Sequence, residues 1–165
     1  MRVFVDTNVL FPFSVMDLML ALTEDSVHQV VWSERLLAEW ERVIVREGRR
    51  SAADYAPLVH RMPGGDPDDR YHAAAACAAG ADALITWNLA DFPAADMARL
   101  GVRVLDPDTY LCELHALWPQ EVSDTLAKLA AGKRNPPLTP DDVLARLGKA
   151  GLTRFADRLA QTGDP

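Results

Sequence analysis

Gly80-Ala-Asp-Ala-Leu-Ile-Thr-Trp-Asn88 is the stretch that decides the fold. Its glycine ends the alanine-rich helix predicted before it, and the apolar run that follows is typical of a short buried strand over 83–86. Polar residues come directly after this run. Residues 2–5 repeat the pattern near the N-terminus, as an apolar run that ends at Asp6. Both segments therefore predict strands whose carboxyl ends carry polar side chains.

The order of the other elements favours a parallel sheet. We predict strands at 2–5, 28–32, 83–86 and 102–105, and helices at 16–22, 33–46, 52–61, 66–80 and 107–117. Strands that alternate with helix-length connections indicate an α/β fold, a central parallel sheet with helices on both faces. After residue 118 only helices are predicted, near 121–131, 141–147 and 153–161. We therefore predict an α/β domain at 1–117 and a helical extension at 118–165.

The charge balance limits the possible functions. The formal net charge is -7 and the sequence pI is about 5.0, which argues against a simple nucleic-acid-binding protein. It does not argue against a nuclease whose carboxylates hold metal ions. Cys77 and Cys112 lie in apolar helical patterns and are interpreted as reduced thiols. No membrane segment and no signal peptide are recognised, so a cytoplasmic location is expected.

Acidic residues gather where a parallel sheet binds its ligands, outside the carboxyl ends of the strands. The first strand runs into Asp6-Thr-Asn8, and the later one into Thr86-Trp-Asn88 with Asp91 beyond it. Asp69 lies in the first turn of the helix before that strand, and Glu39 borders the apolar stripe of an earlier helix. Carboxylates brought together in this way suit Mg²⁺, which takes oxygen ligands and supports phosphodiester hydrolysis.

Each acid also has a structural interpretation. Asp6 is also interpretable as a turn residue. The acids from Asp66 to Asp69 suit the first turn of a helix, and Asp91 suits the cap of the short helix that follows it. Glu39 is also readable as a partly solvated helix residue, and Glu47 is its rival on the same face.

The order of these motifs resembles the PIN-domain family, and within it the VapC-like toxins. The resemblance rests on the runs 3–10, 33–40, 66–70 and 80–92, and above all on the last, with its Gly-Ala-Asp, strand, Thr-x-Asn and Asp-Phe. It covers about residues 1–112. It implies a PIN-like three-layer sandwich. The predicted extension is similar to the C-terminal extension of some VapC-like toxins, although that match is looser.

The resemblance also implies site residues. Its acidic quartet, both catalytic and metal-binding, falls on Asp6, Glu39, Asp69 and Asp91. Asp68 is the alternative to Asp69, which keeps the family's spacing to the helix and the glycine. The supporting residues are Thr7, Asn8, Thr86 and Asn88.

The implied activity is RNA cleavage with Mg²⁺ or Mn²⁺. We expect an endoribonuclease that leaves 5′-phosphate ends and serves as the toxin of a type II toxin–antitoxin system. Its partners would be an RNA substrate and a cognate antitoxin, and a homodimer is expected. The alternative is a non-catalytic PIN-fold module that binds RNA or protein. A haloacid-dehalogenase-type phosphatase is disfavoured because Asn8 stands where that class needs a second aspartate.

Because the chain as a whole is acidic, binding of an RNA backbone would depend on local clusters of basic residues. The densest cluster follows Glu39 and contains Arg46, Arg49 and Arg50 as candidate RNA-binding residues. A solvated helix face is the alternative interpretation of this cluster. Lys133-Arg134 in the extension is a second candidate.

Overall fold

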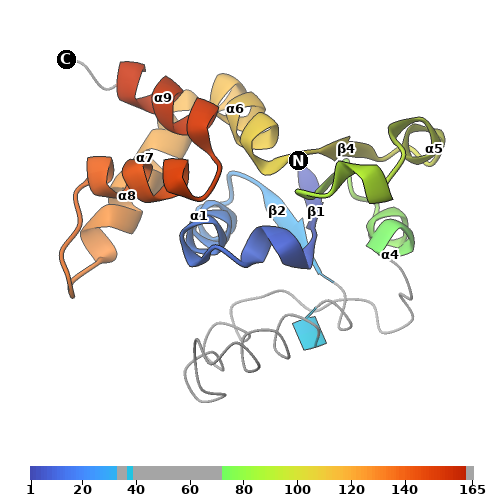
Figure 1. Ribbon diagram of the computed structural model, residues 1–165, viewed down its shortest axis with the longest axis horizontal. Coiled ribbons are helices and arrows are strands. Elements are labelled where there is room, and N and C mark those ends of the chain that lie inside the picture. The colour runs from blue at the N-terminus through green and yellow to red at the C-terminus, as the bar shows by residue number, and fades with distance from the viewer. Residues whose placement is uncertain (33–36, 39–71, 163–165) are drawn as a thin grey trace. The chain divides into compact units, whose positions relative to one another are not determined.

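The computed structural model describes residues 1–32, 37–38 and 72–162, which form two compact units (Figure 1). The first unit contains residues 1–11 and 29–105, and the second contains residues 12–28 and 106–165. The predicted division at residue 117 stays a prediction. Within the described ranges, no helix is long and apolar enough to cross a bilayer.

The first unit is built on a four-stranded parallel sheet. Its strands are β1 (Arg2–Val5), β2 (Gln29–Val31), β3 (Ala83–Ile85) and β4 (Arg103–Leu105), in the order β2-β1-β3-β4. All neighbouring pairs are parallel, so the predicted sheet type is confirmed. In register, Val5 stands opposite Ile85, so the residues that follow β1 and β3 emerge side by side.

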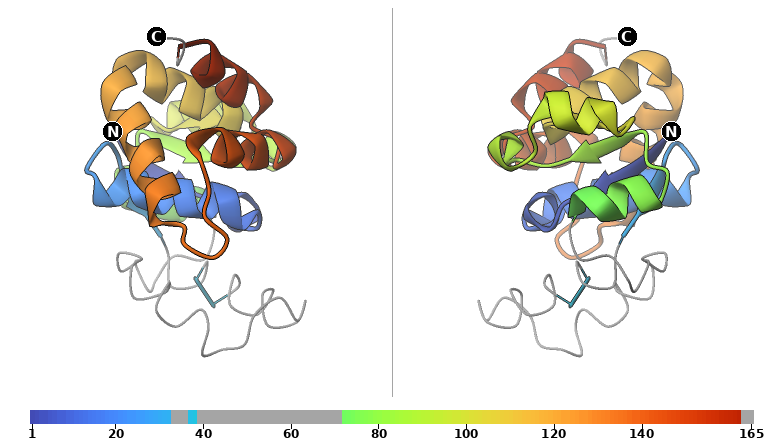
Figure 2. Two further views of the ribbon diagram at one scale, coloured as in Figure 1. Left: turned by 90° about the vertical axis from the view of Figure 1, so that its left-hand side faces the viewer. Right: turned by 90° about the vertical axis from the view of Figure 1, so that its right-hand side faces the viewer.

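The two central strands carry the core of this unit. Val3, Val5 and all of β3 are fully buried, as expected for central strands of a parallel sheet with both faces covered. Helix α4 (His72–Ala78) packs against β1 and β3 (Figure 2). It ends before Gly80, whose φ of +60° is a conformation that favours glycine. The predicted end of the alanine-rich helix is therefore confirmed.

The motif residue Asp82 has a structural role in joining two strands. Its Oδ2 accepts a hydrogen bond of 2.8 Å from the backbone N–H of Arg2, and its own N–H donates to the Arg2 carbonyl at 2.8 Å. The Arg2 side chain also donates to the carbonyl of Ala79 at 2.7 Å, near the end of α4. These bonds fix the start of β1 against β3, and so fix the register that brings Asp6 beside Thr86.

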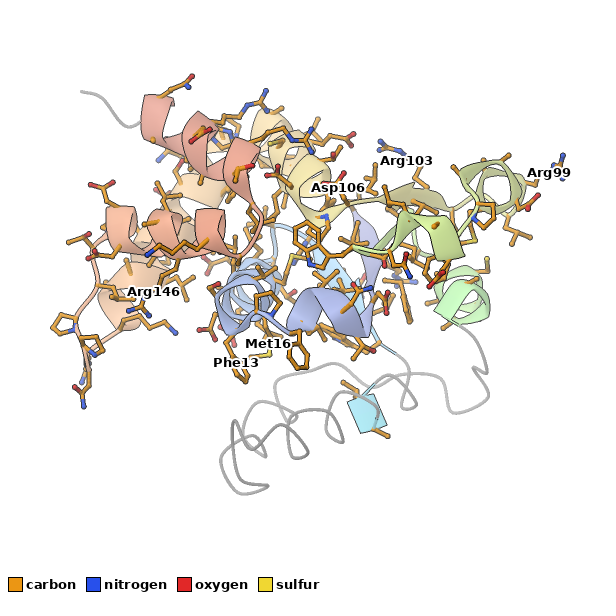
Figure 3. The ribbon with its side chains drawn as sticks, viewed as in Figure 1. Phe13, Met16, Arg99, Arg103, Asp106 and Arg146 are labelled. Atoms are coloured by element: carbon orange, nitrogen blue, oxygen red, sulfur yellow. The ribbon has the colours of Figure 1, made fainter. Side chains whose placement is uncertain are left out.

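Short elements complete the first unit. A 3-10 turn, η1 (Thr7–Leu10), follows β1, and another, η2 (Leu89–Asp91), follows β3. Helix α5 (Ala94–Arg99) leads into β4, and Arg99 extends from its end (Figure 3). The predicted loop and short helix between β3 and β4 are confirmed.

The second unit is helical. It consists of α1 (Phe13–Glu24), α6 (Pro107–Leu117), α7 (Pro119–Gly132), α8 (Pro140–Lys149) and α9 (Thr153–Thr162). Each of α6, α7 and α8 begins with proline, which suits the first helical position because that position needs no N–H donor. The helices after residue 107 lie where the sequence predicts them, to within a few residues.

Polar contacts tie α1 to α7. Asp25, which follows α1, accepts a hydrogen bond of 2.6 Å from the Thr125 hydroxyl, and Lys128 approaches the same carboxylate at 3.1 Å. These two hydrogen bonds lower the pKa of Asp25. Lys133, just beyond α7, pairs with Asp17 of α1 at 2.6 Å. Lys133 is one of the two tail residues proposed as an RNA contact, and its ammonium group is engaged within the unit.

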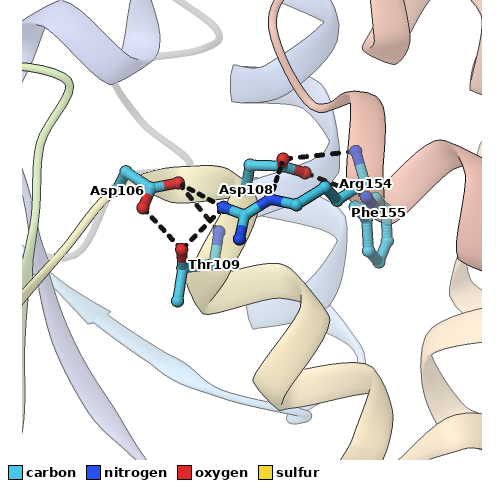
Figure 4. A network of polar contacts seen from close by, with 5 residues as sticks. All are labelled: Asp106, Asp108, Thr109, Arg154 and Phe155. Atoms are coloured by element: carbon cyan, nitrogen blue, oxygen red, sulfur yellow. Dashed lines mark hydrogen bonds and ion pairs between the residues drawn. The ribbon is translucent and has the colours of Figure 1, made fainter.

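A buried carboxylate joins α6 to α9. Asp108, in the first turn of α6, accepts hydrogen bonds from the backbone N–H groups of Arg154 and Phe155, at 3.2 and 2.9 Å (Figure 4). The same carboxylate accepts from Arg154 Nε at 2.9 Å. Asp108 therefore satisfies amides in the first turn of another helix, where a helix normally uses its own N-cap side chain.

Two buried polar rings face each other in the second unit. His28 Nδ1 lies 2.5 Å from the Tyr110 hydroxyl, and its Nε2 lies 2.9 Å from the Met19 carbonyl. A neutral imidazole satisfies both contacts, donating from Nε2 and accepting at Nδ1. Burial lowers the pKa of His28 to about 4 and raises the pKa of Tyr110. The polar groups of this pair are thus fully used inside the unit.

The His28 environment predicts acid sensitivity. In the unfolded chain this histidine takes up a proton near its ordinary pKa of 6.5, whereas in the folded chain it does so only near pH 4. The unfolded state therefore binds more protons in between, and stability falls as the pH drops from about 6.5 to about 4. The full loss is about 3 kcal/mol. Urea unfolding at several pH values measures it.

The variant His28→Gln isolates this contribution. Its free energy of unfolding should depend less on pH in this window than that of the wild type, because the titrating ring is gone. Equal pH dependence in both proteins would show that the folded protein does not hold His28 neutral.

Candidate active site

The carboxyl ends of β1 and β3 bring Asp6 and Thr86 together. The backbone N–H of Asp6 donates to the Ile85 carbonyl at 2.9 Å, which continues the sheet by one residue. The Thr86 hydroxyl donates to Asp6 Oδ2 at 2.6 Å. Asp6 is 7% exposed and Thr86 is fully buried. The carboxylate is thus oriented by a side chain eighty residues away in the sequence.

Asn8 bridges the same two groups. Its Nδ2 donates to Asp6 Oδ2 at 2.7 Å and to Thr86 Oγ1 at 3.0 Å. Its Oδ1 accepts from the backbone N–H of Trp87 at 3.1 Å. An amide is suited to this position because it donates and accepts at once, whereas a second aspartate would only accept.

The network continues to Asp91. The backbone N–H of Asn88 donates to Thr86 Oγ1 at 3.0 Å, and the Asn88 side chain donates to Asp91 Oδ2. Hydrogen bonds therefore connect Asp6, Asn8, Thr86, Asn88 and Asp91 without interruption. The structure brings together all five of these predicted site residues.

The structural interpretation holds for the backbone of Asp6 but not for Asp91. Asp6 begins the turn η1, because its carbonyl accepts from the Val9 N–H at 3.0 Å, but its side chain makes no capping hydrogen bond to that turn. Asp91 does not cap α5, whose N-cap position is Pro93. Both carboxylates instead take part in the network at the edge of the sheet.

Two buried polar atoms near this edge have no hydrogen-bond partner in the part of the chain that the structure describes. They are Thr7 Oγ1, directly after Asp6, and Trp32 Nε1, directly after β2. Thr7 is one of the predicted supporting residues, and its hydroxyl makes no hydrogen bond within the described chain. Buried polar atoms without a partner are rare in folded proteins and often mark a place for a ligand or water.

Several predicted site residues lie outside the described ranges. They are Glu39, Asp69, Arg46, Arg49 and Arg50. Among the described residues, no group of three or more His, Cys, Asp or Glu side chains is close enough to hold a metal ion.

Arg2 and Arg103 each begin a strand, so they lie at the edge of the sheet opposite Asp6.

Two comparisons with known proteins relate the chain to one family. The family model for the VapC50 C-terminal domain matches residues 107–161. A curated protein of Mycobacterium tuberculosis, named "Putative ribonuclease VapC50", is 29% identical over 100 residues. Both comparisons thus make the chain similar to VapC50. The alignment spans 59% of the chain and 59% of that relative. No solved structure matches the chain significantly.

The segment matched by the family model coincides with the C-terminal helices of the second unit. Residues 107–161 correspond to α6, α7, α8 and nearly all of α9, the helices that pack with α1 in the second unit. The matched segment thus begins at the first residue of α6.

Proposed function

We propose that this VapC-like protein is a Mg²⁺- or Mn²⁺-dependent endoribonuclease with a PIN-like three-layer fold. The observation that carries the proposal is the hydrogen-bonded array of Asp6, Asn8, Thr86, Asn88 and Asp91, which follow two neighbouring parallel strands. The name of the M. tuberculosis relative, a ribonuclease, supports the same activity. Glu39 and Asp69 complete the proposed acidic quartet.

The donor set suits a hard divalent cation. The network offers carboxylate, hydroxyl and amide oxygens, which are the donors that a hard cation prefers. Among the described residues, no histidine belongs to the network. In the proposal, Asp6, Glu39, Asp69 and Asp91 would hold the metal. Such an ion activates water and neutralises charge on a phosphodiester.

The chain's own residues have separable tasks in this proposal. Thr86 and Asn8 both donate to Asp6 Oδ2, so they hold the carboxylate in one orientation. Asn88 donates to Asp91 Oδ2 and orients that carboxylate. Water attacks the phosphorus in line, the bond to the ribose 3′ oxygen breaks, and that oxygen takes a proton. The products carry 5′-phosphate and 3′-hydroxyl ends.

The proposal includes a place in a toxin–antitoxin pair. Its supports are the VapC-like family and the C-terminal match to VapC50. We propose that the protein is the toxin component, inhibited by a cognate antitoxin, and that it acts as a homodimer on RNA. Arg46, Arg49 and Arg50 are proposed to contact the RNA backbone.

Mapping of RNA ends in a bacterial host tests this function. Expression of the wild type should arrest growth and create new 5′-phosphate ends at defined sites. Asp6→Asn expressed at the same level should do neither. New ends in both strains, or in neither, would contradict the proposal.

Thr86→Val tests the orienting role of the hydroxyl. Valine has nearly the same shape but cannot donate to Asp6, so cleavage should fall by about 10–100-fold, as for other residues that orient metal ligands. Thr86→Ser keeps the hydroxyl and should stay near the wild-type rate. Initial rates on one RNA at fixed Mn²⁺ give the comparison. Equal rates for the valine and serine variants would remove Thr86 from the site.

A further inference from the structure

The helical unit contains a hollow of its own, away from the proposed active site in the sequence. This first hollow, the one nearest α6 and α7, has a volume of about 630 Å³, which is within the usual range of ligand sites. Side chains from four helices line it, among them His115 of α6, Ser123 of α7, Leu144 of α8 and Leu159 of α9. All of its lining residues lie within the segment that matches the VapC50 C-terminal domain.

A second hollow of about 440 Å³ adjoins the first. The two share Asp141, Leu144 and Ala160, so they meet along the pair of helices α8 and α9. Together they form an elongated groove. A groove of this form suits an extended or helical chain segment better than one compact small molecule.

The floor of the groove is apolar, and the charged side chains that line it are acidic. Leu126, Leu144 and Leu159 contribute apolar surface, and Asp141 and Asp157 contribute two carboxylates. The lining contains no lysine and no arginine. Within the described part of the chain, neither aspartate forms a hydrogen bond or an ion pair with another side chain. The groove therefore complements a ligand that is apolar on one side and basic on the other.

His115 is a second, independent sign of a ligand. The residue is only 5% exposed and lines the first hollow, yet neither ring nitrogen has a hydrogen-bond partner among the described residues. Its one ring contact is an edge-to-face arrangement with Phe155, at 6.5 Å between centroids. Its ring nitrogens are not among the buried polar atoms that lack a partner, so they remain accessible to a ligand in the hollow.

The protonation of His115 suits a basic ligand. Burial, and after it the charge of Arg158, lower the pKa of this histidine. The ring is therefore neutral at pH 7 and does not repel a cation. A neutral imidazole accepts one hydrogen bond and donates another, so it can bind both an N–H group and a carbonyl of a peptide.

We propose that this groove binds a basic, amphipathic peptide segment of a partner protein. Apolar side chains of the segment pack on the leucines, and its Lys or Arg side chains approach Asp141 and Asp157. This mode uses the same physics as other grooves that bind amphipathic segments. The site is distinct from the proposed ribonuclease site and does not depend on it.

Peptide binding to the full-length protein tests the proposal. The probe is a short fluorescent peptide of leucine and arginine, and its control is the matched peptide of leucine and glutamate. Anisotropy should show saturable binding of the basic peptide, weakened by salt, and no binding of the acidic one. Absence of saturable binding of the basic peptide, or equal binding of both, would overturn the proposal.

Variants locate the binding in the groove. Ala160 is exposed and lines both hollows, so Ala160→Trp should obstruct the groove and weaken binding by about 10-fold or more. Ala127→Trp adds the same ring to an exposed position outside both hollows and should bind normally. Equal affinity in the two variants would overturn the proposal.

Charge variants test complementarity. Asp141→Asn combined with Asp157→Asn should weaken binding by about 3- to 10-fold, the range expected for two exposed ion pairs. Glu121→Gln removes an exposed carboxylate outside the groove and is the control. Asp6→Asn should leave the affinity unchanged. A loss of binding in Asp6→Asn with none in the double variant would place the peptide at the ribonuclease site and overturn the proposal.

Discussion

Replacing Asp6 by asparagine is expected to lower the rate of RNA cleavage by roughly 10³-fold, the effect of losing several kcal/mol of metal-dependent transition-state stabilisation. Asparagine is neutral and cannot replace a carboxylate as a strong ligand for a hard cation. Its side chain has nearly the same shape and still accepts a hydrogen bond from Thr86. The folded structure should therefore persist, and the effect should appear in the rate.

The control for Asp6→Asn is Asp96→Asn in the same unit. Asp96 is an exposed residue of α5 that pairs with Arg99 at 3.2 Å, and exposed pairs of this kind contribute little to stability. Both variants should have the circular dichroism spectrum of the wild type. Cleavage by Asp6→Asn at the rate of Asp96→Asn would contradict the assignment of Asp6.

Replacing Asp108 by alanine is expected to destabilise the helical unit by about 2–4 kcal/mol. The carboxylate is 5% exposed and accepts three hydrogen bonds, two from backbone N–H groups at the start of α9 and one from the Arg154 side chain. Alanine would leave those donors without their partner, and the Phe155 N–H is buried. Urea unfolding followed by circular dichroism measures the loss.

Glu121→Ala is the matched control for Asp108→Ala. Glu121 is also an acid in the first turn of a helix, but it is exposed, so its interaction with the helix dipole contributes only about 0.3–1 kcal/mol. A loss in Asp108→Ala no larger than that of Glu121→Ala would show that the joint between α6 and α9 does not stabilise the unit.

Much of the fold follows from local sequence. The strands are short apolar runs with clear polar ends, and Gly80 and Pro107 mark where helices end and begin. The sequence does not show that α1 groups with the C-terminal helices, because this depends on tertiary contacts such as Asp25 with Thr125 and Asp17 with Lys133. For the same reason the sequence does not distinguish Asp108 from an ordinary first-turn acid.

The site is predictable in its members but not in its bonding. A strand that ends in Asp-Thr-Asn beside one that ends in Thr-Trp-Asn predicts that these side chains meet. The pattern does not predict that Asn8 joins Asp6 to Thr86, or that Asn88 holds Asp91, because both contacts depend on side-chain directions. The groove on α8 and α9 has no sequence signature, since its leucines look like ordinary core residues.

Direct titration of the protein with Mn²⁺ tests the central claim, that carboxylates at the ends of β1 and β3 bind a shared cation. Isothermal calorimetry of the wild type should show saturable Mn²⁺ binding, competed by Mg²⁺. Asp6→Asn and Asp91→Asn should each weaken that binding, while Asp96→Asn should not. Mn²⁺ binding of equal affinity in all four proteins, or no binding to the wild type, would contradict the account.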